Sequence, residues 1–282
     1  MTADDLQIPP ADAGRPAAAT GGRATAGRSI VVRVLGNSGV WALADQAVCS
    51  GGNFLTMLIV ARTLAGDPFG QYWLLLQVVQ FLNGLHGAVV TYPLTLAGAA
   101  AATERFRQLV RRGLGFTLAV GPVLGLVVLA AAMRADRPTL FPWVAAAMVL
   151  WQAQETCRRA LIARLAHRWA IPGDVVSFLG QAAGVWALRA NGALTPESAF
   201  AVIAVTSGLA AAIQTAQILL TRAARLRDEP AAGAGPAPAA PGVVAEAAGW
   251  WRTGRWLLLT SFVNVGTVYL CPWVLETARG HA

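Results

Sequence analysis

The sequence predicts an all-α integral membrane protein, a multi-helix transmembrane bundle. The 282 residues are 56% hydrophobic and only 13% charged, whereas soluble domains are about a quarter charged. Several uninterrupted apolar stretches approach the ~20 residues that a helix needs to cross a bilayer. The basic residues lie between these stretches and form no separate basic domain. Helices in lipid are therefore the units of this fold.

The chain divides into four predicted regions. Residues 1–36 are rich in Ala, Gly, Pro and Asp and contain no apolar run, which predicts a disordered cytosolic tail and no signal peptide. Residues 37–227 are predicted to form a lobe of six spans, at 41–61, 71–96, 113–133, 140–157, 170–188 and 199–220. Residues 228–250 are predicted to form a Pro/Ala/Gly-rich cytosolic linker, and residues 251–282 a seventh transmembrane helix, at 256–275, with a short outer tail.

A weak internal repeat crosses the linker. Placing Trp256 on Trp41 also aligns Val263 with Val48, at a constant offset of 215 residues. The repeat predicts that the seventh helix is the first helix of a second unit in the same orientation.

The arginines predict the orientation of the bundle. All 22 basic residues are arginine; 17 of them lie on the side of the N-terminus and 5 on the other. Because cytosolic loops carry the excess of basic residues, we expect a multi-pass protein of a bacterial cell (inner) membrane with its N-terminus in the cytosol and its C-terminus outside. The net charge of +8 is then accounted for by topology and by anionic lipid headgroups, and no nucleic-acid partner is predicted.

Polar side chains recur at helical spacing on one face of several spans. Asp45, Cys49 and Thr56 share a face of the first span, and Ser177 and Gln181 share a face of the fifth. A polar group in hydrocarbon costs free energy unless it meets a partner or a watery cavity. Small and amide-bearing faces are also how membrane helices pack together. Both interpretations, a cavity and helix packing, are open for these faces.

Two carboxylates inside the predicted spans have more than one predicted role. Asp45 lies about one turn from the cytosolic edge, where it either snorkels, pairs with an arginine such as Arg33, or carries a coupling proton. Asp174 follows Pro172 and Gly173, which favours an interfacial helix N-cap over a transport role.

Two further polar positions favour structural roles. Glu155 has Arg158 and Arg159 at i+3 and i+4, so we expect a salt bridge on an interfacial helix. His86 is a lone imidazole, for which a hydrogen bond in helix packing is favoured over a proton relay.

No motif of an enzyme is found. The chain has no Lys for a P-loop, no GxSxG and no HExxH, and its three histidines are scattered. Its three cysteines are odd in number and form no CxxC pair. We therefore predict no enzymatic activity, no cofactor and no metal site.

The run from Trp41 to Leu94 resembles the opening of the polysaccharide-export (O-antigen) flippases of the multidrug/oligosaccharidyl-lipid/polysaccharide exporter superfamily. The segment that carries the resemblance joins the first two spans and contains Ala61, Arg62, Leu64, Gly66, Phe69, Gly70 and Tyr72. Tyr92 and Pro93 match an aromatic-proline step late in the second span.

The resemblance implies one six-helix lobe of a two-lobe transporter plus a seventh helix. Such a transporter would alternate its access and carry an undecaprenyl-pyrophosphate-linked glycan to the outer leaflet. With a single lobe, three explanations are open: a truncated gene product, association with a second lobe or a second copy as a homodimer, or loss of transport. The family is also expected to hold basic residues in its cavity; none of the predicted spans has a central arginine, and Arg62 is the nearest.

The first functional hypothesis is therefore a flippase of a lipid-linked oligosaccharide. The predicted cavity-lining or substrate-binding residues are Asp45, Gln46, Asn53, Arg62, Gln77, Gln80, Asn83, Asp174, Gln181 and Gln214. The alternatives are a cation-coupled multidrug exporter of the same superfamily, with Asp45 as its proton or sodium site, and a non-transporting scaffold. A scaffold would recruit a glycosyltransferase or polymerase through its Arg-rich cytosolic loops.

Overall fold

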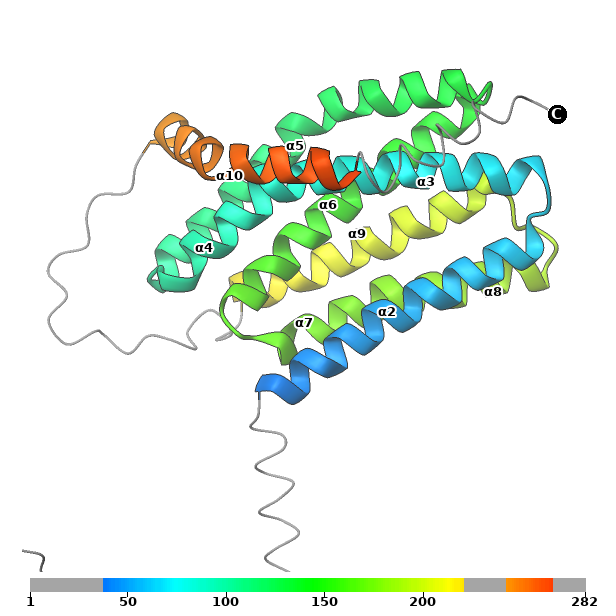
Figure 1. The fold of residues 1–282 in the computed structure, drawn as a ribbon. Coiled ribbons are helices and arrows are strands. Elements are labelled where there is room, and N and C mark those ends of the chain that lie inside the picture. The colour runs from blue at the N-terminus through cyan, green and yellow to red at the C-terminus, as the bar shows by residue number, and fades with distance from the viewer. Residues whose placement is uncertain (1–37, 221–241, 266–282) are drawn as a thin grey trace, which may run out of the picture.

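The computed structural model describes residues 38–220 and 242–265, and within these ranges it consists of helices joined by short loops and contains no strand (Figure 1). Short 3-10 and π turns link some of the helices. The elements in chain order are α2 (Ser38–Thr63), α3 (Asp67–His86), η1 (Gly87–Thr91), α4 (Tyr92–Ala100), α5 (Thr103–Arg134), η2 (Pro138–Leu140), α6 (Phe141–Ala163), α7 (His167–Asp174), η3 (Val175–Leu179), α8 (Gly180–Ala190), α9 (Pro196–Leu220) and α10 (Val243–Val265).

Four helices are long and apolar enough to cross a membrane, which supports a membrane protein. They are Gly39–Thr63, Asp67–Ala100, Thr103–Arg134 and Pro196–Leu219. The other three predicted spans correspond to α6, to the α7–η3–α8 segment and to α10. These carry charged side chains in their sequences, which lowers their apolarity, and their insertion into a bilayer stays a prediction.

Two of the long segments contain one turn of π-helix. In η1 and η3 the chain widens for five residues without ending the helix. A proline lies close to each of these turns, Pro93 after η1 and Pro172 before η3. Because proline removes a backbone donor and crowds the preceding turn, the hydrogen-bond ladder is rearranged there. Such π turns occur frequently at functional sites.

Two apolar cores are separated by a layer of buried polar side chains. The first core gathers around Tyr72, Met148 and Phe200, and the second around Phe106 and Leu161. On α6, α9 and α5 the polar positions fall between the residues of the two cores. The buried polar layer comprises Asp45, Thr117, Gln152, Gln154, Thr156, Arg158, Asp174, Ser177, Gln181, Ser207 and Gln214.

Helix α10 begins earlier than predicted and packs on the outside of the bundle, across α3 (Figure 1). It starts at Val243, so the prediction that the linker extends to residue 250 is wrong. Glu246 forms ion pairs with both Arg105 and Arg112 of α5. Trp250 packs edge-on against Phe116, with ring centroids 5.2 Å apart. No proline occurs between Pro241 and the end of α10 at Val265, and these contacts stabilise the early turns of the helix.

Three predicted regions fall wholly or partly outside the described residues. These are the cytosolic tail at 1–36, most of the linker and the C-terminal part of the predicted seventh helix. Of the residues that support the internal repeat, Trp41, Val48, Trp256 and Val263 are described, and all four lie in helices.

Candidate functional site

Arg158 on α6 is the centre of a buried charged cluster. Its Nη2 lies 2.8 Å from Oδ2 of Asp45 on α2, and its Nε lies 3.2 Å from Oδ2 of Asp174 on α7. Its Nη1 lies 3.5 Å from Glu155 Oε2, one turn earlier on α6. The side chains of Asp45 and Asp174 are 4% and 0% exposed. One guanidinium therefore joins the consecutive helices α6 and α7 to α2, which lies far away in sequence.

This cluster corrects the predicted position of Arg158. Helix α6 continues to Ala163, six residues beyond the predicted end of the fourth span at Cys157, so Arg158 and Arg159 lie within the helix. Both predicted pairs of Glu155 are confirmed, and its Oε1 lies 2.5 Å from the half-exposed Arg159. Arg158, however, also turns into the bundle and meets Asp45. The predicted partner of Asp45, Arg33, lies outside the described residues.

Asp174 accepts hydrogen bonds from three other side chains. Its Oδ2 accepts the Arg158 contact, and its Oδ1 accepts from Gln154 Nε2 at 3.4 Å and from Gln214 Nε2 at 3.1 Å. The interpretation of Asp174 as an interfacial N-cap is wrong, because it is the last residue of α7 and the helical path continues through η3. Burial would make a carboxylate costly, and these donors and the guanidinium offset that cost.

Two glycines let the helices approach closely around Asp174. A Cβ at Gly173 would lie 2.6 Å from the side chain of Gln214, and a Cβ at Gly52 would lie 2.6 Å from the backbone of Phe178. Gly173 therefore brings α9 within hydrogen-bond distance of Asp174. Gly52 seats α2 against the π turn η3, which places Asp45 beside Arg158.

A row of hydrogen bonds leads away from Asp174 toward α8. Gln181 Nε2 donates to Ser177 Oγ at 3.4 Å, Ser177 Oγ donates to Gln154 Oε1 at 2.9 Å, and Gln154 Nε2 donates to Asp174 at 3.4 Å. Every donor in this Gln181–Ser177–Gln154 row points toward the carboxylate, and all three side chains are buried. Successive hydrogen bonds that point the same way polarise one another.

The row ends at a small cavity of about 180 Å³ between α2, α3, α6, α8 and α9. The walls include Asn53 and Thr56 of α2, Gln80 of α3 and Gln181 of α8, together with aromatic residues such as Trp73. Three predicted cavity-lining residues, Asn53, Gln80 and Gln181, therefore share one cavity. Amides among aromatic rings are the lining expected where a polar ligand is oriented by a few hydrogen bonds.

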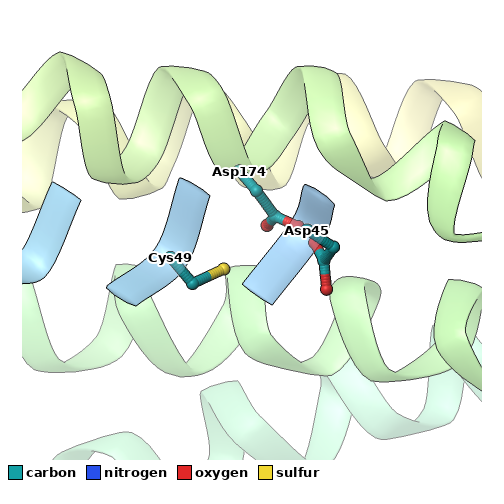
Figure 2. A group of neighbouring side chains, drawn as sticks. All are labelled: Asp45, Cys49 and Asp174. Atoms are coloured by element: carbon teal, nitrogen blue, oxygen red, sulfur yellow. The ribbon is translucent and has the colours of Figure 1, made fainter. Parts of the chain in front are cut away.

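Asp45, Cys49 and Asp174 also resemble a set of metal ligands. One ligand atom from each lies within 4.8 Å of the others. Figure 2 shows Cys49 one turn from Asp45 on α2, with Asp174 projecting toward Asp45 from the facing helix. The guanidinium of Arg158 already contacts both carboxylates. A positive charge at that position repels a second cation, so the contacts favour an ion-pair cluster over a metal site.

The remaining predicted cavity residues lie elsewhere. Gln46 is exposed and donates to Ser50 at 2.9 Å, and Arg62 is exposed in the last turn of α2. Gln77 and Asn83 are half-buried on α3 and do not line the 180 Å³ cavity. The polar face of α3 is thus divided, and only Gln80 reaches the cavity.

Two members of the site were missed from the sequence, Arg158 and Gln154. They stand at i and i+4 on α6 and therefore share one face of that helix. Gln154 has no exposed surface. Polar residues at this spacing across the end of the fourth predicted span were the available signal. This signal was overlooked, because a salt bridge with Glu155 already accounted for Arg158.

His86 has the packing role predicted for it. Its Nε2 lies 2.8 Å from Thr117 Oγ1, and Thr117 Oγ1 lies 3.3 Å from Thr156 Oγ1. These contacts join α3, α5 and α6 through buried side chains.

Comparisons with known proteins return no match. No protein-family model, curated protein or solved structure matches the chain.

Proposed function

We propose that this chain is a transporter-like membrane protein that flips a lipid-linked oligosaccharide across the bacterial inner membrane. The Gln181–Ser177–Gln154 row is the observation that carries the proposal, because it connects a cavity lined by amides to a buried charged cluster. A merely structural ion pair needs no such connection. In this proposal six helices form one lobe, with the N-terminus in the cytosol, and a second lobe or a second copy completes the transporter.

The cavity would hold polar groups of the glycan, and the charged cluster would respond to its presence. A sugar hydroxyl that donates to Oε1 of Gln181 polarises the amide that donates to Ser177. This strengthens the row of donors to Asp174 and so biases the contact of Asp174 with Arg158. Coupling of this kind alters the packing of α2 against η3 and requires no nucleotide hydrolysis.

Complementation tests the flippase proposal. The chain is expressed in a bacterial strain that lacks its own oligosaccharide flippase, and surface glycan is measured. We expect export with the natural chain and a loss of export with Gln181→Leu, which removes the amide at the cavity. Gln46→Leu is the matched control, because Gln46 is exposed on α2 and should leave export unchanged. No export with the natural chain, or equal export in both variants, contradicts the proposal.

A second candidate, the cation-coupled multidrug exporter, is favoured by the charge balance of the cluster. Asp45 and Asp174 together carry one more charge than Arg158 neutralises, and Oδ1 of Asp45 is buried without a hydrogen-bond partner in the described part of the chain. An excess negative charge in an apolar setting favours uptake of a proton. Dye efflux that is lost in Asp45→Asn supports the exporter, whereas a flippase shows no efflux with either chain.

A further inference from the structure

An open groove of about 580 Å³ runs between α5 and α6, apart from the charged cluster. Its floor and walls include Gly121, Pro122 and Gly125 of α5 and Ala145 and Val149 of α6, and none of its lining residues has a polar side chain. The groove and the 180 Å³ cavity share no lining residue. A ligand in the groove therefore does not lie on the proposed path of the glycan.

Small residues and one proline form this groove. A Cβ at Gly125 would meet no atom within 4 Å, whereas a Cβ at Gly121 would lie 3.3 Å from Val149. Gly121 therefore lies at the floor, where the helices touch, and Gly125 opens into free space. Pro122 between them interrupts the helical hydrogen bonds and prevents α5 from following α6 closely.

The rim of the groove is as apolar as its floor. Helix α5 has a mean hydropathy of 2.3, the highest of the four candidate spans. Leu118 and Leu126, which line the groove, are 62% and 66% exposed, and the neighbouring Val123 is 62% exposed. In a bilayer such a surface meets hydrocarbon chains, and in water it would be a costly apolar patch.

Two arginines lie at one end of the groove. The turn between α5 and α6 is closed by Arg137 N, which donates to Ala132 O at 2.9 Å, and Phe141, just beyond this turn, lines the groove. Arg134 and Arg137 are exposed, and in the described part of the chain they form no ion pair. Exposed Asp136 lies between them, so the turn has a net charge of one positive unit.

The end of the groove nearer the two arginines lies within the depth of one bilayer leaflet. At 1.5 Å per residue, Leu126 and Leu118 lie about 12 and 24 Å along α5 from Arg134. One leaflet of the hydrocarbon core is about 15 Å thick. A chain in this leaflet with its headgroup beside the two arginines therefore reaches the part of the groove at Leu126 and Gly125, and not the far end at Leu118.

We infer that the α5–α6 groove binds one hydrocarbon chain of an anionic bilayer phospholipid, with the phosphate beside Arg134 and Arg137. Basic positions at the ends of transmembrane helices recognise anionic headgroups in this way. The inference rests on the membrane insertion of the proposed function and not on its transport. Because the groove is separate from the polar cavity, a structural phospholipid is favoured over the transported lipid.

Native mass spectrometry tests the groove. The full chain is purified in detergent and mixed with dioleoyl-phosphatidylglycerol or with uncharged dioleoyl-phosphatidylcholine. We expect retention of phosphatidylglycerol by the natural chain and its loss in Gly125→Leu, which fills the groove. Gly115→Leu is the matched control, because Gly115 lies on the same helix outside the groove and its Cβ also meets open space. Equal retention in both glycine variants overturns the inference.

The charged end of the groove has its own test. Arg134→Gln and Arg137→Gln should each weaken the binding of phosphatidylglycerol about fivefold. This corresponds to the ~1 kcal/mol expected of an arginine near a headgroup. Arg62→Gln, at the exposed end of α2, should leave the binding of phosphatidylglycerol unchanged. If Gly125→Leu fails to fold, these arginine variants still test whether the groove binds an anionic phospholipid. Displacement of phosphatidylglycerol by undecaprenyl phosphate would overturn the choice of phospholipid.

Failure of the groove inference can be distinguished from failure of the proposed function. If the natural chain does not insert into membranes, the proposed function fails first. If it inserts and exports glycan but retains phosphatidylglycerol no better than phosphatidylcholine, only the groove inference is overturned.

Discussion

Adjacent arginines on α6 have opposite environments. Arg158 points into the bundle and contacts Asp45 and Asp174, whereas Arg159 is 48% exposed and pairs with Glu155. A rotation of about 100° per residue separates the two side chains on the helix. A buried arginine that neutralises buried carboxylates is strongly coupled to them, and an exposed ion pair contributes little.

This contrast predicts very different effects of the same substitution. Arg158→Gln leaves Asp45 and Asp174 buried without a positive partner, so we expect a loss of about 3–5 kcal/mol in unfolding free energy. Arg159→Gln should cost less than about 1 kcal/mol. Thermal unfolding in detergent micelles, followed by tryptophan fluorescence, measures both. Similar shifts in Tm for the two variants would mean that the buried cluster does not stabilise the bundle.

Sequence patterns located the carboxylates of the site but not their counter-charge. The spacing of Asp45 and Cys49 on α2, and of Asp174 and Ser177 across η3, indicated inward faces, and all four side chains are buried. The partner of Asp45 could not be predicted, because Arg158 is 113 residues away and nothing local fixes which face of α6 meets α2.

Close helix contacts depend on glycines whose neighbours lie far along the chain. Gly173→Ala should push Gln214 away from Asp174 and destabilise the protein by about 1–3 kcal/mol through overpacking. Gly180→Ala is the control, because its Cβ would lie at an ordinary 3.4 Å from Thr206 and alanine favours the helix by about 0.5–1 kcal/mol. Chemical unfolding should therefore give opposite signs for the two variants, and equal signs would contradict the contact.

Helix α10 is held by a close approach at Gly254, by the ion pairs of Glu246 with two arginines of α5, and by the packing of Trp250 against Phe116. A Cβ at Gly254 would lie 2.4 Å from the carbonyl oxygen of Ala88 in η1, whereas a Cβ at Gly249 would meet nothing within 4 Å. Gly254→Leu should undock α10 and raise hydrogen–deuterium exchange over residues 243–263. Gly249→Leu should leave the exchange unchanged. Unchanged exchange in Gly254→Leu would place the stability of α10 elsewhere, in its contacts through Glu246.

Elements were easier to predict than their ends and their irregularities. Each predicted span overlaps a helix, because long apolar runs leave no other backbone solution in lipid. The π turns were not predicted. Proline indicates that the backbone hydrogen bonds of a helix are disturbed, but it does not determine whether a π turn, a kink or a break results. The early start of α10 depends on Arg105 and Arg112, which are far away in sequence.

The whole molecule has a predicted topology that reporter fusions can test. Reporters are inserted into the loops at Ala65, Ala101, Asp136, Leu165 and Gly192. We expect them to alternate outside, inside, outside, inside, outside, because each intervening helical segment crosses once. Asp136 and Leu165 flank α6, which carries the buried arginine. Reporters at these two positions on the same side would show that α6 does not cross the membrane.

The direction of the Gln181–Ser177–Gln154 row also has a consequence for selectivity. Its dipoles add with their positive ends toward Asp174, so the electron-rich end of the row, the carbonyl oxygen of Gln181, is left for the cavity. This carbonyl oxygen accepts hydrogen bonds from hydroxyl groups, such as those of a sugar, and repels the negative charge of a bare phosphate. Polyols should therefore compete with the glycan for the cavity, and inorganic phosphate should not.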